Sequence, residues 1–354
     1  MNSKKKKSFL YFSTGIVSII IMLALAFSFS GCCITAYLAD LSKTKSMESA
    51  AAAGANETDT QETTTQETTA IESAATLDTT EGGTTASDQQ SSESKLKEIG
   101  QKFDQFITSG ADTVEIFSFI DANIKDADPE LATVMVAKVI EISEEKKFDF
   151  TDKFTSHGIQ TAISDALGGE YIVDMEMLKN TTDVKLKDLI AETISKKYKI
   201  ISVEGFFMPI VDYVAYDIYR EFITEEMNSF MDIYLDESVQ PAVLDLGIVI
   251  SSDEFLGRIN KAFKYLADYP DSPRYAKVKQ LNAGRLRVYL GGIDNTPVFD
   301  HSNKIYPEKL AEFEDFAIKY EGAELGDILK SYLTLLSSEN YIHTAKIDEF
   351  LQNF

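Results

Sequence analysis

Residues 95–129 read KLKEIGQKFDQFITSGADTVEIFSFIDANIKDADP, and this stretch decides the fold class. Its apolar residues recur three or four positions apart, first over 96–107 and again over 114–124. That spacing places them on one face of a helix. Gly110 and Pro129 end the two runs, and Pro129 also suits the first turn of a third helix. The stretch therefore predicts consecutive amphipathic helices.

The same period continues along the rest of the chain. Further helices are expected over 129–139, 154–167, 184–198, 208–230, 256–269, 275–290, 307–320, 325–336 and 342–354. The Gly- and Pro-rich breaks between them are short, and short loops join antiparallel neighbours. We therefore expect an all-α fold over residues 96–354, either a helical bundle or stacked helical hairpins, with a possible sub-boundary near 200–205.

Two β-branched stretches, 198–204 and 246–251, interrupt this pattern. Neither has an obvious partner at hairpin spacing. We interpret them as helix starts or short buried connectors, and a small sheet is the alternative.

The N-terminal segment predicts export. Four lysines, Lys4 to Lys7, precede a stretch over 9–30 that has no charged residue. This pattern is typical of a secretory signal or a membrane span. Lysines beside such a segment remain on the cytoplasmic side. The chain after residue 40 is therefore expected on the extracytoplasmic face of the cell membrane.

The end of the apolar stretch, Ser30, Gly31 and Cys32, resembles the lipobox of bacterial lipoprotein precursors. The resemblance implies that Cys32 carries the lipid, an acyl group such as palmitate, and becomes the mature N-terminus. Cys33 is an alternative or additional acylation site. Residues 1–31 are then a cleaved signal peptide. The competing interpretation is an uncleaved signal-anchor helix, because the charge-free stretch is long enough to span a bilayer.

Residues 32–95 are expected to form a disordered tether. Over 46–94 the chain has ten acidic side chains, no Lys or Arg, and only three isolated large apolar residues. Such a segment cannot bury enough surface to offset the entropy of ordering. It would hold the helical domain away from the membrane.

The charge of the remaining chain limits its partners. Residues 95–354 have 28 basic and 46 acidic side chains, a net charge of −18. A surface of this sign does not attract nucleic acid or an anionic lipid face. The expected partners are the membrane, through the lipid anchor or N-terminal helix, and another envelope protein or wall polymer. We expect no nucleic acid partner and no cofactor.

Residues 263–278, FKYLADYPDSPRYAKV, resemble the junction between helices in tetratricopeptide-like proteins. Pro270 would end the first helix, Asp271 or Ser272 would cap the second, and Pro273 would lie in its first turn. No second copy follows at a period of 34 residues. The resemblance supports a helix-turn-helix unit.

Few residues suggest chemistry. His157, His301 and His343 are isolated in sequence, so they predict neither a metal site nor a catalytic dyad. The loop over 294–303 has several oxygen ligands that suit calcium, although turns use the same residues. The carboxylate pairs at 144–145 and 225–226 could act as acid and base on a wall polymer, but solvated helix faces have such pairs too. We predict no catalytic residue and no metal ligand.

The aromatic stretch over 198–234 is the best candidate for a binding surface. Tyr213, Tyr216 and Tyr219 recur at every third position. Aromatic residues at helical spacing more often form a core, but an exposed part of this stripe would line a groove for a peptide, glycan or helix.

These features predict a membrane-anchored extracytoplasmic lipoprotein that acts as a binding or scaffolding module. Two alternatives remain: a cell-envelope enzyme that acts on wall polymer through carboxylates, and an extracytoplasmic sensor or substrate-capture protein.

Overall fold

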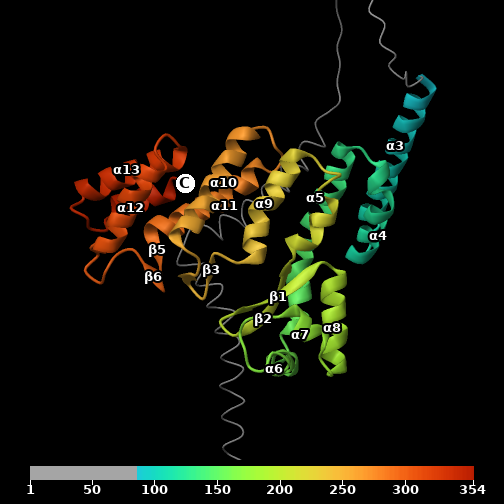
Figure 1. Ribbon diagram of the computed structural model, residues 1–354, viewed down its shortest axis with the longest axis horizontal. Coiled ribbons are helices and arrows are strands. Elements are labelled where there is room, and N and C mark those ends of the chain that lie inside the picture. Colours follow the sequence, from blue (N-terminus) through green and yellow to red (C-terminus); the bar gives the residue numbers. More distant parts are fainter. Residues whose placement is uncertain (1–85) are drawn as a thin grey trace, which may run out of the picture. The chain divides into compact units, whose positions relative to one another are not determined.

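Helices dominate the part of the chain that the structure describes (Figure 1). The computed structural model describes residues 86–354, with side chains from residue 93 onward. The predicted leader, Cys32 and the tether up to residue 85 lie outside the described residues. Helix α3 (Ala86–Thr108) already begins at Ala86, earlier than the expected start of the helical domain. The all-α prediction is confirmed.

Most of the first helices follow the predicted period, except for a short one at Met175–Lys179 that was not predicted. They are α3, α4 (Thr113–Asn123), α5 (Pro129–Thr151), α6 (His157–Ala166), α7 (Met175–Lys179) and α8 (Val184–Ser195), with short 3-10 turns η1 (Ile124–Asp126) and η2 (Asp152–Phe154). Asp112 and Glu115 form a capping box at the start of α4. Pro129 occupies the first turn of α5 behind the N-cap Asp128, as predicted. Helix α5 continues well past the predicted end at 139.

The stretch over 198–204 is a strand, which corrects our interpretation as a helix start or connector. Strand β1 (Tyr198–Val203) pairs antiparallel with β2 (Phe206–Val211) around a two-residue turn. Glu204 and Gly205 both have positive φ, 50° and 72°, as this tight turn requires. Glu-Gly is not among the strong hairpin dipeptides, so the sequence signal was weak.

The helix predicted over 208–230 is also wrong. That region contains the end of β2, the 3-10 helix η3 (Tyr213–Tyr219) and the start of α9 (Glu225–Val239). Pro209 has no N–H and clashes with the preceding turn inside a helix, whereas it is tolerated at a strand edge.

The C-terminal part consists of stacked helical hairpins, as predicted (Figure 1). Helix α10 packs against α11, α12 packs against α13, and α10 also contacts α13. Their bounds are α10 (Ser252–Asp268), α11 (Tyr275–Gly291), α12 (Pro307–Lys319), α13 (Glu324–Ser338) and α14 (Ala345–Gln352). Two short hairpins connect them, β3 (Val243–Leu244) with β4 (Gly247–Ile248), and β5 (Gly292–Ile293) with β6 (Thr296–Pro297). The stretch over 246–251 therefore includes a strand and is not a helix start.

The junction between α10 and α11 differs in detail from the prediction. The N-cap residue of α11 is Arg274, not Asp271 or Ser272. Ser272 contributes in another way, because its Oγ accepts a hydrogen bond of 2.9 Å from the backbone N–H of Arg274.

The described residues contain two hydrophobic cores. The first is formed by residues from Ile99 to Phe230 together with Met231, Ile233 and a few side chains of α10 and α11, and the second lies between Ala242 and Ile347. Residues 200–205 belong to the first core and its hairpin turn, so the change of core falls near Gln240 and not at the suggested sub-boundary.

Three hairpin turns from separate parts of the chain meet beside these cores. The backbone N–H of Glu204 donates to the Asp245 carboxylate at 2.5 Å. The side-chain amide of Asn295 donates to the Asp245 carbonyl at 2.5 Å. Its backbone N–H donates to the Leu246 carbonyl at 2.8 Å. These bonds fix the tip of the β1–β2 hairpin against the C-terminal hairpins.

Candidate functional site

The predicted aromatic stripe is not an exposed surface. Tyr213, Tyr216 and Tyr219 are 3%, 0% and 1% exposed, so all three belong to the core. The prediction of a binding surface there is wrong. In η3 three residues complete one turn, so a spacing of three places every ring on the same face.

The tyrosine hydroxyls are satisfied inside the protein. Tyr216 donates to Ser143 Oγ at 3.2 Å, and Tyr219 donates to Asp121 Oδ1 at 2.6 Å. Burial raises the pKa of both phenols well above its ordinary value. These groups remain protonated and hold η3 against α4 and α5.

One carboxylate of each pair, Glu144 and Glu226, is held in an ion pair of the fold. Glu226 accepts hydrogen bonds from Arg274, Tyr265 and Ser272, the last at 2.7 Å. Burial raises the pKa of Glu226, but these bonds outweigh burial and lower it overall. Glu144 is paired with Lys147 at 2.7 Å. A carboxyl group that acts as a general acid needs a raised pKa, whereas the pKa of Glu226 is lowered.

The histidines and the 294–303 loop fit structural roles. His157 and His301 are exposed, and His343 Nε2 lies 3.1 Å from Asp348 Oδ1. In the loop, Asp300 Oδ1 accepts from the backbone N–H groups of Ser302 and Lys304, at 2.7 and 3.0 Å. Within residues 86–354, no three His, Cys, Asp or Glu side chains are placed to hold a metal ion.

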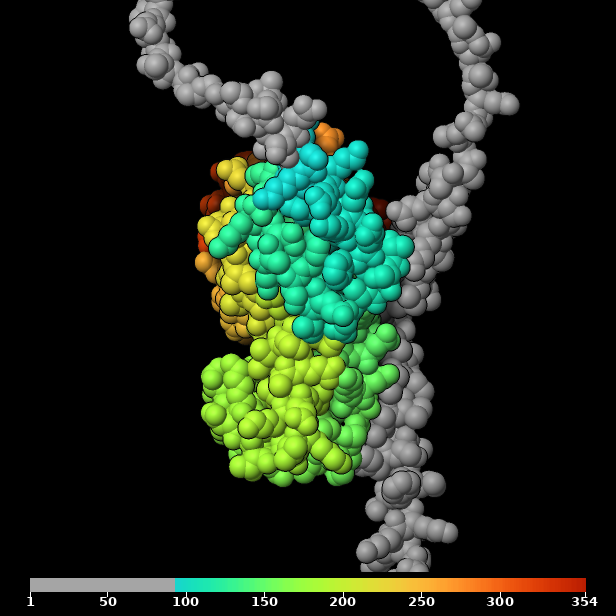
Figure 2. All heavy atoms as spheres, turned by 90° about the vertical axis from the view of Figure 1, so that its right-hand side faces the viewer, coloured from blue at the N-terminus to red at the C-terminus, as the bar shows by residue number. Residues whose placement is uncertain are grey.

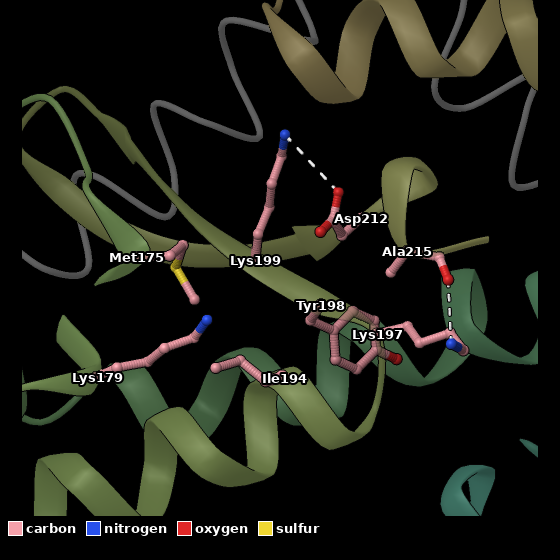
Figure 3. A pocket seen from close by; sticks show the side chains of 8 residues that line it. All are labelled: Met175, Lys179, Ile194, Lys197, Tyr198, Lys199, Asp212 and Ala215. Carbon is pink, nitrogen blue, oxygen red and sulfur yellow. Dashed lines mark hydrogen bonds and ion pairs between the residues drawn. The ribbon is translucent and has the colours of Figure 1, made fainter. Parts of the chain in front are cut away.

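A pocket of about 130 Å³ lies where α7 and α8 meet the start of β1 (Figure 3). The sequence analysis did not single out its residues. They are Met175, Lys179, Ile194, Lys197, Tyr198, Lys199, Asp212 and Ala215. Three lysines thus line one pocket with a single carboxylate, in a chain whose overall charge is −23.

Local geometry places these lysines around the pocket. Helix α8 ends at Ser195, and Lys197 takes a left-handed conformation, with φ 53°, that turns the chain into β1. Lys199 follows two residues later on the opposite face of β1 from Tyr198. Lys179 comes from the last turn of α7. Figure 3 shows Lys179 and Ile194 on one side of β1, with Lys199 and Asp212 on the other.

The three ammonium groups have different partners. Lys197 Nζ donates to the Ala215 carbonyl at 3.0 Å and lies 5.0 Å from the centre of the Phe117 ring. Lys179 Nζ is 2.5 Å from Glu176 Oε1. Lys199 Nζ lies 4.0 Å from Asp212 Oδ1, beyond hydrogen-bond distance. Of the three ammonium groups, that of Lys199 therefore has the weakest contact with a partner in the protein.

Burial changes the ionisation of two of these lysines, Lys197 and Lys199. It lowers the pKa of Lys197 and of Lys199, because both ammonium groups lose part of their hydration. Asp212 opposes this change by favouring the charged form. A bound anion would restore the missing interaction. The sequence signal that could have found the site is the basic cluster Lys196-Lys197-Tyr198-Lys199 in an acidic body.

Apolar side chains are exposed on the same segment of the chain. Tyr171 and Ile172, in the loop between α6 and α7, are 70% and 82% exposed, and Met177 and Val184 are also exposed. Figure 2 shows this segment in green and yellow-green below α3 and α4. The segment thus combines a cationic pocket with apolar contact surface.

Comparisons with known protein families, curated proteins and solved structures find no match for this chain. Among residues 86–354, no helix has the length and apolar character needed to cross a membrane.

Proposed function

We propose that this protein is a membrane-anchored extracytoplasmic lipoprotein whose helical body is a binding module for an anionic partner. The observation that carries the binding role is the pocket lined by Lys179, Lys197 and Lys199 in an otherwise acidic body. A cationic site in such a body is selective, because the surrounding carboxylates repel anions that do not reach it.

The anchoring role rests on the sequence. Cys32 follows Ser30 and Gly31 at the end of the apolar stretch, and the acidic segment after it would separate the body from the lipid face. The partner is then another envelope protein or a wall polymer with exposed carboxylate or phosphate groups.

The binding role is tested by titrating the full-length chain in detergent with acetate, succinate and phosphate in a calorimeter at constant ionic strength. We expect saturable binding of at least one of these anions. Lys199→Met keeps the aliphatic stem and removes the charge, so it should weaken binding roughly tenfold or more, as expected for the loss of a charge-assisted hydrogen bond.

A matched control is Lys138→Met, which removes an exposed lysine of α5 that pairs with Glu141. It should leave anion binding unchanged. Equal affinities of the wild type and Lys199→Met, at equal melting temperatures, would contradict the proposed binding site.

A further inference from the structure

The lysine-lined pocket also has an apolar side. Ile194, in the last turn of α8, is 39% exposed, although isoleucine is among the residues most often buried. The half-buried side chain of Met175, at the start of α7, lines the same pocket. Figure 3 shows the ends of these two side chains directed toward one another, with the Lys179 ammonium beside them. Aliphatic surface and positive charge therefore border one space.

The fold does not need the exposed surface of Ile194. Among residues 93–354, the side chains that pack against the two hydrophobic cores do not include Ile194. Single exposed apolar side chains are common on protein surfaces, but Ile194 lines a pocket together with a second aliphatic side chain. A ligand with an apolar group would remove this surface from water, which is favourable.

The pocket is open to solvent and small. The side chains of Lys179 and Lys199 are 43% and 18% exposed, so a ligand can reach the charged groups as well as Ile194. The volume of about 130 Å³ is close to that of an engineered cavity of about 150 Å³ that binds benzene. A ligand of about six non-hydrogen atoms therefore fits.

The two kinds of lining select among small anions. Phosphate has no group that could contact the aliphatic surface. Succinate would bring a second carboxylate toward Ile194 and Met175, and a charge that loses its water without gaining a partner is costly. A carboxylate with a short alkyl chain satisfies both sides of the pocket, because charged and apolar groups in such sites fix the orientation of a ligand together.

We propose that the pocket binds a carboxylate with a short alkyl group, of about four or five carbons in all, whose chain lies against Ile194 and Met175 and whose carboxylate lies beside the lysines. This inference rests on the proposed function and names the class of its ligand. Two sources present this chemistry: a free short-chain acid, and the C-terminal residue of a peptide, where a carboxylate lies next to an aliphatic side chain. Ile194 is then the residue that determines specificity for the chain.

The test compares acetate, butyrate and acetyl-valine as ligands of the full-length chain in detergent, in a calorimeter at constant ionic strength. Burying one methylene group strengthens binding about fourfold. Butyrate has two carbons more than acetate, so we expect it to bind roughly tenfold more tightly. Tighter binding of acetyl-valine than of butyrate assigns the source to a peptide C-terminus, and the reverse order assigns it to a free acid.

Ile194→Ala reduces the apolar side of the pocket and keeps every lysine. Alanine suits a helix, so the melting temperature should not fall. We expect acetate to bind within twofold of its wild-type affinity, and the preference for butyrate over acetate to fall at least threefold. Val184→Ala is the matched control, because Val184 is 70% exposed on the same helix and lies outside the pocket. It should keep the wild-type preference.

The outcomes separate this inference from the proposed function. Butyrate that binds no more tightly than acetate, phosphate or succinate overturns the alkyl carboxylate as the ligand, and so does an unchanged preference in Ile194→Ala. If acetate or phosphate still binds in a way that depends on Lys199, the anion-binding module stands. If none of these ligands shows saturable binding, both are overturned.

Discussion

The conformation of η3 decides the role of its three tyrosines. Tyr213, Tyr216 and Tyr219 share one buried face because three residues make one turn of a 3-10 helix. The ring of Tyr216 packs edge-to-face against Phe117, with 5.7 Å between the ring centroids. It packs in the same way against Tyr219, with 6.3 Å between the centroids. This aromatic cluster stabilises the first core.

Tyr216→Ala should therefore lower the free energy of unfolding by about 3–5 kcal/mol, the cost of truncating a fully buried aromatic side chain. The matched control is Tyr171→Ala, because Tyr171 is 70% exposed. It should change stability by less than about 0.5 kcal/mol. Denaturant titration followed by circular dichroism measures both. A Tyr216→Ala protein as stable as the control would contradict the assignment of η3 to the core.

The sequence indicates which types of residue tend to be buried, but not which way each side chain points. Aromatic character predicts burial, yet Phe206 is only half-buried and its neighbour Phe207 is buried. In a strand, adjacent side chains point to opposite faces, so an error in secondary structure exchanges the buried and the exposed residue. The lysines of the pocket were missed for a related reason, since α7, α8 and β1 meet only in the fold.

Among the elements, Glu226 links the start of α9 to the junction of α10 and α11. It accepts hydrogen bonds from Arg274 and Ser272 in the junction and from Tyr265 in α10. Its pKa is lowered overall, although burial by itself would raise it. Folding therefore favours the carboxylate form of Glu226.

The sign of this pKa change fixes the pH dependence. A lowered pKa in the folded state contributes stability above the unfolded value of about 4.3, and that stability is lost as the pH falls through the folded value. Glu226→Gln should reduce the melting temperature at pH 7, and the difference from the wild type should shrink below about pH 4. Glu225→Gln, at the exposed neighbour, should show no such difference. A difference that is constant from pH 7 to pH 3 would contradict the ion pair.

Helices were predictable and hairpins were not, for a physical reason. An amphipathic helix repeats its pattern over many residues, so 275–290 and 307–320 match α11 and α12 almost to the residue. The hairpin β3–β4 has only two residues in each strand, and its turn residues Asp245 and Leu246 adopt positive φ without a glycine. Its pairing depends on contacts with Asn295, which lies far away in sequence.

For the molecule as a whole, a cluster of three charged side chains lies between the two hydrophobic cores. Glu237, near the end of α9, lies 2.7 Å from Arg285 and 3.4 Å from Arg258, and both arginines are almost fully buried. Its other oxygen accepts from the Ala242 N–H at 2.9 Å, where the second core begins. Each of these charges depends on the others, because an unpaired buried charge is strongly destabilising.

The charge of the chain is distributed unevenly along the sequence. Basic residues gather before the apolar N-terminal stretch, acidic residues follow it, and the body has a net charge of −18. An acidic body held near an anionic lipid face would be repelled from it. Under the proposed function, this arrangement would present the module to partners away from the membrane, and the lysine-lined pocket would accept an anionic group.

The central claim, an anchored module displayed outside the cell membrane, is tested most directly at Cys32. The measurement is the mass of the N-terminal peptide of the mature protein, together with labelling by a radioactive fatty acid, for the wild type and Cys32→Ala. We predict that the wild-type mature chain begins at Cys32 and carries lipid, and that Cys32→Ala is unlabelled and unprocessed. A wild-type chain that retains residues 1–31 and takes up no label would contradict the lipoprotein assignment and favour the signal anchor.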